Sequence, residues 1–277
     1  MNTGRKISIM GIVNLTDDSY FAESRCADVE AALDRVACMV ADGADIIDIG
    51  ACSTRPGSVP VGEEEEWRRL EPVLRALRKR FPHVLFSIDT CFSSVVCKAY
   101  DILGRFIVND ISAGEADPAM LSTVGGLKLP YVAMHMRGTP QTMQSLTDYK
   151  DVVSEVLEYF RFFSEKASEN GIDEWILDPG FGFAKTIEQN YNLLAGLRTF
   201  KMLRKGDGSE IPLLVGISRK SMVYRLLGIT PEESSTATQS LHMVALQNGT
   251  DILRVHDVAE TMRTVKLYHT LSGCYKM

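Results

Sequence analysis

Short apolar runs alternate along the chain with longer amphipathic stretches. Eight runs rich in branched apolar residues predict strands, at 7–13, 45–49, 84–88, 106–108, 131–134, 175–177, 212–217 and 252–255. Runs of this kind are typical of strands that are covered on both faces, as in parallel sheets. The stretches between most of them predict helices, at 29–41, 63–80, 93–103, 118–124, 149–170, 187–200, 234–248 and 259–271.

The stretch at 149–170 shows the helical pattern most clearly. Val156, Phe160 and Phe163 recur at helical spacing, so they fall on one face of a helix. Gly171 follows the stretch directly, and a left-handed glycine commonly ends a helix at such a position. This segment is therefore expected to pack one apolar face against the sheet.

Strands that alternate with helices favour a parallel sheet, because parallel strands need a crossover connection. Eight such repeats predict closure into a (β/α)8 TIM barrel, and an open doubly wound sheet is the alternative. The chain has 277 residues, and barrels of about 250 residues commonly fold as one domain. Because no linker or low-complexity segment divides the sequence, residues 1–277 are expected to form a single α/β domain.

Composition and charge narrow the choice of partners. The 30 Lys and Arg residues against 36 Asp and Glu give a net charge of −6, which argues against a general nucleic-acid or membrane-surface binder. No apolar run approaches the roughly 18 residues that cross a bilayer, and no signal-peptide pattern is evident at the N-terminus. The six cysteines fit neither a zinc site nor a disulfide framework. We expect a cytoplasmic protein without a nucleic-acid or membrane partner.

A polar or ionisable residue follows each apolar run. Active sites of barrels lie at the carboxyl ends of the strands, so these side chains would converge on one site. Two of them, Asp48 and Asp89, lie inside or against apolar sequence, where a carboxylate needs a hydrogen-bonding or charged partner. In chain order the residues are Asn14, Asp48, Asp89, Asn109 with Asp110, His135, Asp178, Ser218 with Arg219 and Lys220, and Arg254 with His256.

These residues divide by their chemistry. The asparagines and aspartates offer acceptors and amides that suit a polar, nitrogen-rich ring. Arg219, Lys220, Arg254 and His256 follow the last two strands, where phosphate sites are often built in this fold. Together with Arg55, these cations stand out in a chain of net negative charge and predict an anionic group on the substrate.

The segments that carry these residues resemble the dihydropteroate synthase family, the folate-pathway enzymes targeted by sulfonamides. The resemblance covers residues 7–269, and the segments stand in the family's order. They are MGIVNLT (10–16), DIIDIGACSTRPG (45–57), SIDT (87–90), NDIS (109–112), MHMRGTPQTMQ (134–144), ILDPGFGFAKT (176–186), LLVGISRKSM (213–222) and DILRVHD (251–257). Any one segment is a weak match, whereas the whole set at these spacings is highly specific.

The resemblance implies a TIM barrel that condenses 6-hydroxymethyl-7,8-dihydropterin diphosphate with 4-aminobenzoate, forming 7,8-dihydropteroate and diphosphate. It implies a dissociative, Mg2+-assisted substitution, in which diphosphate leaves first and the aniline nitrogen attacks the resulting cation. It also implies binding of sulfonamide inhibitors and a homodimer through the outer helices of the last repeats.

The resemblance also implies roles for individual residues. Those expected to be catalytic are Asp89, Asp178, Lys220 and Arg254. Those expected to bind the pterin are Asp89, Asn109, Asp178 and Lys220, with Met134, Ile111 and Gly216. Those expected to hold the diphosphate are Asn14, Thr54, Arg55, Arg254 and His256, with Asn14 also on the Mg2+ ion. Those expected to form the aminobenzoate site are Thr54, Arg55, Pro56, Phe183, Lys220 and Ser221.

For other residues a structural role competes with a functional one. Asp48 is expected to tie neighbouring loops together by hydrogen bonds rather than to touch the substrate. His135 fits a wall of the site or a scaffold for a loop, and Arg219 fits the site or an outward structural ion pair. Cys52 is expected to be a packed side chain, because no partner that would activate its thiol is evident.

The first loop departs from the family pattern. Asp17 stands where the family usually has proline, and Ala22 and Glu23 stand near its usual glycines. Two interpretations compete: either Asp17 or Asp18 lies near the Mg2+ ion, or Asp17 faces solvent and changes only the stiffness of the loop. Because of this departure, the family resemblance gives the weakest basis for predicting how the loop closes and whether sulfonamides inhibit the protein.

Three other functions are compatible with parts of the pattern. Methyl transfer from methyltetrahydrofolate to a corrinoid protein shares the fold and the pterin site, but it needs no anchor for diphosphate. A Schiff-base aldolase would use Lys220 as its nucleophile. A non-catalytic pterin-binding relative is the third, and the complete set of strand-end residues speaks against it.

Overall fold

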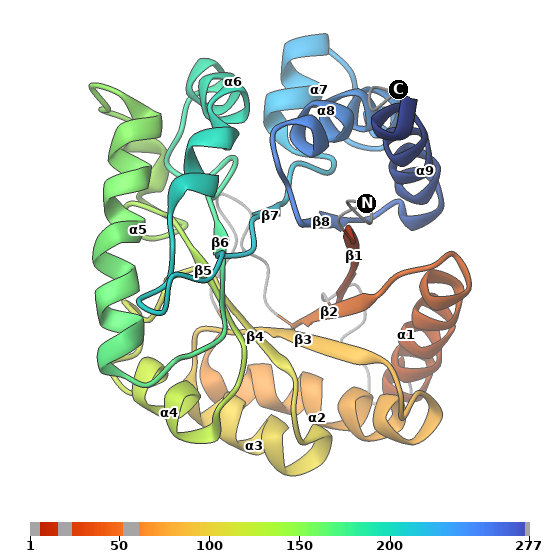
Figure 1. Ribbon diagram of the computed structural model, residues 1–277. Coiled ribbons are helices and arrows are strands. Elements are labelled where there is room, and N and C mark those ends of the chain that lie inside the picture. The colour runs from red at the N-terminus through yellow and green to blue at the C-terminus, as the bar shows by residue number, and fades with distance from the viewer. Residues whose placement is uncertain (1–5, 16–23, 52–60, 275–277) are drawn as a thin grey trace.

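The computed structural model describes residues 6–15, 24–51 and 61–274, and Figure 1 shows a ring of parallel strands surrounded by helices. The strands are β1 (Ser8–Asn14), β2 (Ile46–Gly50), β3 (Leu85–Asp89), β4 (Ile107–Asp110), β5 (Tyr131–Met134), β6 (Trp175–Asp178), β7 (Leu214–Val215) and β8 (Ile252–Val255). The helices are α1 (Ser24–Ala41), α2 (Glu63–Arg80), α3 (Ser93–Leu103), α4 (Met120–Leu127), α5 (Val152–Glu169), α6 (Ile187–Ala195), α7 (Ser221–Leu227), α8 (Ser235–Gln247) and α9 (Val258–Cys274), with 3-10 turns η1 (Met143–Ser145) and η2 (Leu197–Met202). The predicted TIM barrel is confirmed.

The two ends of the sheet meet, which excludes the open doubly wound alternative. The strand order is β6-β5-β4-β3-β2-β1-β8-β7, and a parallel bridge between Leu177 and Leu213 joins the two end strands. The Leu177 amide donates to the Pro212 carbonyl at 2.9 Å. Pro212 has no N–H to donate in return, and the Leu213 amide donates to the Asp251 carboxylate at 2.7 Å. The strand predicted at 212–217 is limited to Leu214–Val215.

Two helices differ from the sequence prediction. The helix predicted at 187–200 is divided at Gly196 into α6 and η2, and a Cβ on Gly196 would lie 2.7 Å from a methyl group of Val153 on α5. The short helix α7, which begins directly after Lys220 and ends at the left-handed Gly228, is missing from the prediction. Within the described residues, no helix combines the length and the apolar character needed to cross a membrane.

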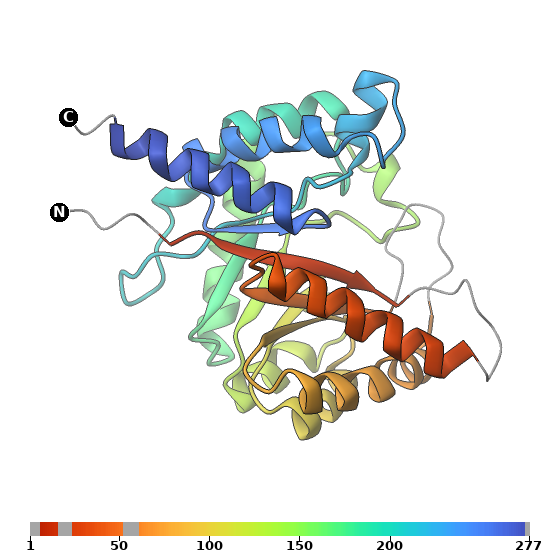
Figure 2. The same cartoon turned by 90° about the vertical axis from the view of Figure 1, so that its right-hand side faces the viewer.

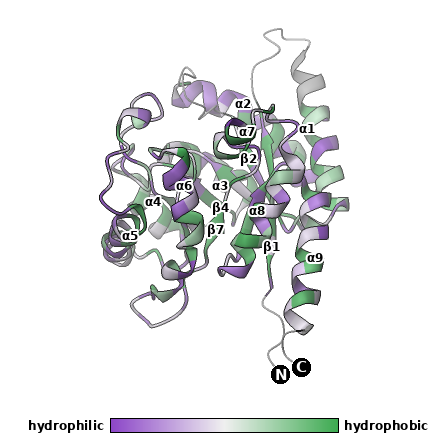
Figure 3. Cartoon of the chain, turned by 90° about the horizontal axis from the view of Figure 1, so that it is seen from above, coloured by the Kyte–Doolittle hydropathy of each residue, from purple (hydrophilic) through white to green (hydrophobic). Residues whose placement is uncertain are grey.

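Apolar side chains fill two separate regions. One is a plug inside the barrel, formed by Met10, Ile46, Ile107, Val132, Ile176, Leu214 and Ile252. The larger region lies between the sheet and the helices, where the Trp175 ring packs against Phe160 and Phe163 of α5 with centroids 6.3 and 5.0 Å away. Figure 3 shows the same division, with apolar strands at the centre and polar stretches on the surrounding helices.

The strands point toward one end of the barrel. Figure 2 shows β1 between α1 and α9, with its arrowhead on the side to which the other parallel strands also run. Side chains at the carboxyl ends of all the strands therefore meet at this end, as expected for the active site of a barrel.

Candidate active site

A polar layer lies directly above the apolar plug. Side chains alternate between the two faces of a strand, so the residue two positions after each plug residue also points inward. On β2 this step leads from Ile46 to Asp48, and on β8 it leads from Ile252 to Arg254. On the other strands of the plug the same step leads to Ile12, Asn109, Met134, Asp178 and Gly216, so the layer is polar on some strands and apolar or open on others.

Asp48 holds two neighbours of this layer. Its carboxylate accepts from Arg254 Nε at 2.7 Å and from Asn109 Nδ2 at 3.1 Å. A second guanidinium nitrogen of Arg254, Nη2, donates to Asp89 Oδ2 at 2.9 Å. Asp48 is fully buried, and its contacts tie strands together rather than the loops that the sequence analysis expected.

Burial shapes the ionisation of this layer. It raises the pKa of Asp89 to about 7, although the Arg254 guanidinium opposes the shift. Burial also raises the pKa of Asp178, against the effect of the Lys220 ammonium. Burial alone would lower the pKa of Arg254, but the Asp48 and Asp89 carboxylates raise it by more than this. The pKa therefore lies above its usual value, and the guanidinium stays charged. The layer thus combines a permanent cation with carboxylates whose charge a ligand can change.

Lys220 lies beside a flat aromatic surface. Its Nζ donates to the Phe181 carbonyl at 2.6 Å and lies 4.8 Å from the centre of the Phe183 ring. Gly216 leaves room in front of it, because a Cβ there would lie 3.9 Å from Lys220 Nζ and 3.8 Å from Arg254 Cβ. Burial lowers the pKa of Lys220 to about 8, although the Asp178 carboxylate opposes this.

The loop after β6 is held by its backbone. The Gly180 amide donates to Asp178 Oδ1 at 2.8 Å. Gly180 has a φ of +72°, and a Cβ there would lie only 2.0 Å from the His135 carbonyl oxygen. His135 itself contacts Lys185 beneath this loop, so it lies among the loop's supports rather than with the polar layer.

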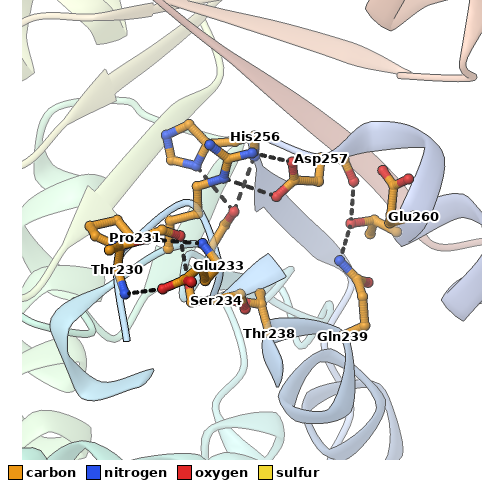
Figure 4. Close-up of polar contacts among 12 residues, drawn as sticks. Thr230, Pro231, Glu233, Ser234, Thr238, Gln239, His256, Asp257 and Glu260 are labelled. Atoms are coloured by element: carbon orange, nitrogen blue, oxygen red, sulfur yellow. Dashed lines mark hydrogen bonds and ion pairs between the residues drawn. The ribbon is translucent and has the colours of Figure 1, made fainter. Parts of the chain in front are cut away.

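The ends of β7 and β8 are joined by two contacts. Ser218 Oγ lies 3.1 Å from His256 Nδ1 and accepts from the His256 backbone amide at 3.2 Å. Arg219, a non-glycine residue with a φ of +54°, forms an ion pair with Asp257. Figure 4 shows His256 next to Asp257, above Thr238 and Gln239 of α8 and beside Glu260 of α9. Arg219 therefore has the structural partner that was one of its two expected roles.

His256 is neutral in this environment. Burial lowers its pKa to about 4, and the nearby Arg254 guanidinium acts in the same direction. Its backbone neighbour Asp257 accepts from Thr261 Oγ1 through its carbonyl at 2.8 Å, and Gln239 of α8 donates to the same hydroxyl at 3.4 Å. Figure 4 includes this link between α8 and α9, which supports the end of β8 from behind.

The other predicted residues differ in exposure, and several of them lie outside the described residues. Asn14 is exposed at the end of β1, while Met134 and Ile111 are buried and Ser221 opens α7. Phe183 is half-buried beside Lys220. Thr54, Arg55, Pro56, Cys52, Asp17, Asp18, Ala22 and Glu23 lie outside the described residues.

Asp110 does not join the site, although it also ends a strand. It follows Asn109, so it points to the opposite face of β4 and accepts from the Tyr131 hydroxyl at 2.6 Å and the Gly114 amide at 2.8 Å. Two buried or paired residues, Lys185 and Asp257, were not among the predicted site residues. Each lies inside a segment that carries the family resemblance, ILDPGFGFAKT (176–186) or DILRVHD (251–257), and that membership is the signal the sequence offers.

Metal ligands are scarce around the site. Within residues 6–15, 24–51 and 61–274, no three His, Cys, Asp or Glu side chains lie close enough together to hold a metal ion. Asn14 Oδ1 and Asp89 Oδ2 lie on either side of Gly50, where a Cβ would be 3.5 and 3.6 Å from them. Any bound cation would therefore need further oxygen ligands from substrate or water.

Comparison with known proteins agrees with this geometry. The pterin binding enzyme family matches residues 10–256. The dihydropteroate synthase of Escherichia coli (strain K12) is 38% identical over 268 residues, which cover 96% of this chain and 92% of the relative.

Solved structures lead to the same family. The Yersinia pestis dihydropteroate synthase in complex with a sulfonamide drug has a TM-score of 0.87 and 36% identity, covering 97% of this chain and 95% of that one. The Burkholderia cenocepacia enzyme complexed with 7,8-dihydropteroate has a TM-score of 0.87 and 35% identity, covering 98% of this chain and 93% of that one. The chain belongs to the dihydropteroate synthase family of pterin-binding enzymes, the transferases of folate synthesis.

Proposed function

We propose that this enzyme joins 6-hydroxymethyl-7,8-dihydropterin diphosphate to 4-aminobenzoate and releases 7,8-dihydropteroate and diphosphate. One observation carries the proposal: carboxylates and a fixed guanidinium share one buried layer, with a lysine and an aromatic ring beside it. A similar structure holds 7,8-dihydropteroate, a product that contains both the pterin and the aminobenzoate.

The pterin is proposed to lie over the polar layer. Its aminopyrimidine edge carries N–H groups, and the carboxylates of Asp89 and Asp178 can accept hydrogen bonds from them. Asn109 is fixed by Asp48 and offers its remaining amide hydrogen and its carbonyl oxygen. Gly216 leaves the space for a flat ring, and Met134 and Ile111 supply apolar surface around it.

The diphosphate is proposed to lie between the ends of β1 and β8. Among the described residues Arg254 uses Nε and Nη2 on Asp48 and Asp89, so its third nitrogen remains for an anion. Neutral His256 can donate a hydrogen bond to the same anion. Thr54 and Arg55 are proposed to complete this site.

Mg2+ fits this end of the site as a cofactor. It prefers oxygen ligands and commonly takes one or two from the protein, with the rest from phosphates and water. The Asn14 carboxamide oxygen, on the other side of Gly50 from the Asp89 carboxylate, is a ligand of this type. When bound, Mg2+ would neutralise charge on the diphosphate as the leaving group departs.

The reaction is proposed to be dissociative. The bond between the exocyclic carbon and the diphosphate oxygen breaks first. Arg254, through its positive charge, and His256, through a hydrogen bond, stabilise the departing anion. The carboxylates of Asp89 and Asp178 stabilise the cation left on the pterin. The aniline nitrogen then attacks that carbon to form the C–N bond, and its surplus proton passes to water. Catalysis would rest on positioning and on charges that are already in place.

The aminobenzoate is proposed to bind against Phe183, Lys220 and Ser221, with Thr54, Arg55 and Pro56. The Phe183 ring offers a flat apolar surface, and Lys220 next to it offers a cation. A sulfonamide that resembles aminobenzoate would compete for this place. A similar structure contains a sulfonamide drug, which supports the proposal.

Diphosphate release tests the proposed reaction. The enzyme is mixed with the dihydropterin diphosphate, 4-aminobenzoate and Mg2+, and diphosphate and dihydropteroate are measured together. Equal amounts of the two products are expected, and Arg254→Gln should slow the reaction by about 100-fold or more. Arg198→Gln is the control, because Arg198 donates to the Gln247 carbonyl on the exposed surface. No diphosphate release by the folded protein would rule the reaction out.

A homodimer through the last helices is a second part of the proposal. Among the described residues, exposed large apolar side chains concentrate on α7, α8 and α9, as Leu226, Leu227, Val244, Met262, Leu267 and Leu271. Such surfaces often mark protein interfaces. Sedimentation of the wild type should give the mass of two chains, and Leu226→Glu combined with Leu267→Glu should shift it toward one.

The cytoplasm is the proposed compartment. Cys38, Cys91 and Cys97 are free thiols, and unpaired cysteines suit a reducing environment. Fractionation of the source cells should recover the enzyme with cytoplasmic markers.

A further inference from the structure

Lys185 is a buried lysine outside the polar layer. It is 4% exposed, and its Nζ lies 3.0 Å from His135 Nδ1, 3.0 Å from the Gly180 carbonyl and 2.9 Å from the Phe183 carbonyl. Burial lowers the pKa of Lys185 to about 7, although the Asp178 carboxylate opposes this shift. In its ammonium form the side chain has three protons, which match these three acceptors. Among the described residues, no carboxylate forms an ion pair with it.

The contact with His135 has a defined direction. Burial lowers the pKa of His135 to about 2, and the Lys185 and Arg137 charges act in the same direction. A neutral imidazole can accept at Nδ1 while its other nitrogen carries the proton. The His135 ring is held by edge-on packing against Tyr159, with centroids 4.9 Å apart. Lys185 is therefore fixed on one side to His135, which directly follows β5, and on the other to the loop after β6.

The loop at 180–184 needs such support. Gly180, Gly182 and Ala184 have φ values of +72°, +83° and +50°, and the left-handed conformation costs about 1–2 kcal/mol for a residue such as alanine. The loop has anchors outside itself. Lys185 holds the Gly180 and Phe183 carbonyls, and Asn190 Oδ1 accepts from the Gly182 amide at 2.7 Å.

The same loop presents its other groups to the candidate active site. The Phe181 carbonyl accepts from Lys220 at 2.6 Å, and the Phe183 ring faces the Lys220 ammonium at 4.8 Å. A shift of the loop would therefore move the aromatic ring and the cation together.

We propose that Lys185, braced by His135, is a positioning residue that fixes the 180–184 loop and so sets the aminobenzoate end of the site. Lys185 contacts no substrate itself and acts through Phe183 and Lys220. This inference rests on the proposed function for its substrate, but the anchoring of the loop is independent of any reaction.

Lys185→Met tests the anchor, because methionine has a similar length and no donor. The KM for 4-aminobenzoate and the Kd for a sulfonamide should each rise roughly tenfold, since two buried carbonyls lose their donor. The KM for the pterin diphosphate should change less, because Asp89, Asn109 and Arg254 are held by contacts within the polar layer rather than by this loop. Lys166→Met, at an exposed position of α5, is the control and should change neither constant. Lys185→Arg keeps a cationic donor and should partly restore the aminobenzoate KM.

Hydrogen exchange of the 180–184 backbone amides gives a readout that needs no substrate. Exchange should be faster in Lys185→Met than in the wild type and unchanged in Lys166→Met. If the Met variant does not fold, Lys185→Gln, which retains a short donor, takes its place. Unchanged exchange together with an unchanged aminobenzoate KM in either folded variant would overturn the inference. If the wild type forms no dihydropteroate, the proposed function fails, and the exchange data still decide whether Lys185 anchors the loop.

Discussion

Arg254 on β8 donates from Nε to the buried carboxylate of Asp48 on β2, at 2.7 Å and across 206 positions of the sequence. The same carboxylate accepts from Asn109 on β4. One aspartate that is not expected to contact substrate thus orients two groups that are. Because the Arg254 guanidinium is already held in place, it needs little rearrangement when the diphosphate binds. This arrangement favours catalysis by preorganised charge.

Loss of the Asp48 carboxylate should destabilise the fold. Asp48→Ala leaves the Arg254 cation in a buried place with only Asp89, and breaking a buried pair costs about 3–5 kcal/mol. Urea unfolding would measure this loss. Glu260→Ala is the matched control, because the Arg263–Glu260 pair is exposed and should contribute under about 1 kcal/mol. An equal effect of the two changes would contradict the role of Asp48.

Binding of the pterin should depend on pH through Asp89. Burial raises the pKa of this carboxyl to about 7. The ionised carboxylate can accept hydrogen bonds from the pterin N–H groups at both oxygens, whereas the protonated carboxyl carries a hydrogen on one of them. As the pH falls through about 7 the carboxylate becomes protonated, so pterin affinity should fall. Calorimetry across this range would show the change, and Asp89→Asn should bind weakly at every pH while remaining folded. An affinity that stays constant below pH 7 would remove Asp89 from the pterin site.

Gly180→Ala should harm the site more than an equivalent change elsewhere. Both Gly180 and Gly228 have left-handed backbones, with φ of +72° and +66°, so alanine costs about 1–2 kcal/mol at each. At Gly180 the new Cβ would also lie 2.0 Å from the His135 carbonyl, whereas nothing lies within 4 Å at Gly228. The aminobenzoate KM should therefore rise in Gly180→Ala alone, while both variants lose some stability. A normal KM in Gly180→Ala would show that the loop tolerates displacement.

The prediction for Asp17 rests on the sequence alone, because this residue lies outside the described residues. If Asp17 or Asp18 lies near the metal, activity should depend strongly on Mg2+, and Asp17→Pro should reduce that dependence and alter sulfonamide affinity. The proline otherwise changes only chain entropy, by about 1 kcal/mol at most. Initial rates titrated with Mg2+ in both proteins decide between these outcomes, and superimposable curves would leave Asp17 without a role at the metal.

The sequence could predict the barrel and its polar layer because both depend on local periodicity. Side chains of a strand alternate between its two faces, so an apolar residue at Ile46 or Ile252 implies that Asp48 or Arg254 shares its face. The same rule separates Asn109, which points inward, from Asp110, which does not. Short elements could not be predicted in this way, because a helix as short as α7 does not show a clear helical period.

The sequence by itself therefore determined that polar side chains gather at the carboxyl ends of the strands, although it also placed Asp110 and His135 among them, and these two lie elsewhere. Only the tertiary structure decided their partners: Asp48 with Arg254 and Asn109, Arg219 with Asp257, and Lys185 with His135 and two carbonyls of a loop. The physical reason is that periodicity is a property of one strand, whereas a contact between strands depends on how the sheet staggers as it closes. That closure is set by the packing of the whole chain, and the charged residues take their partners from it.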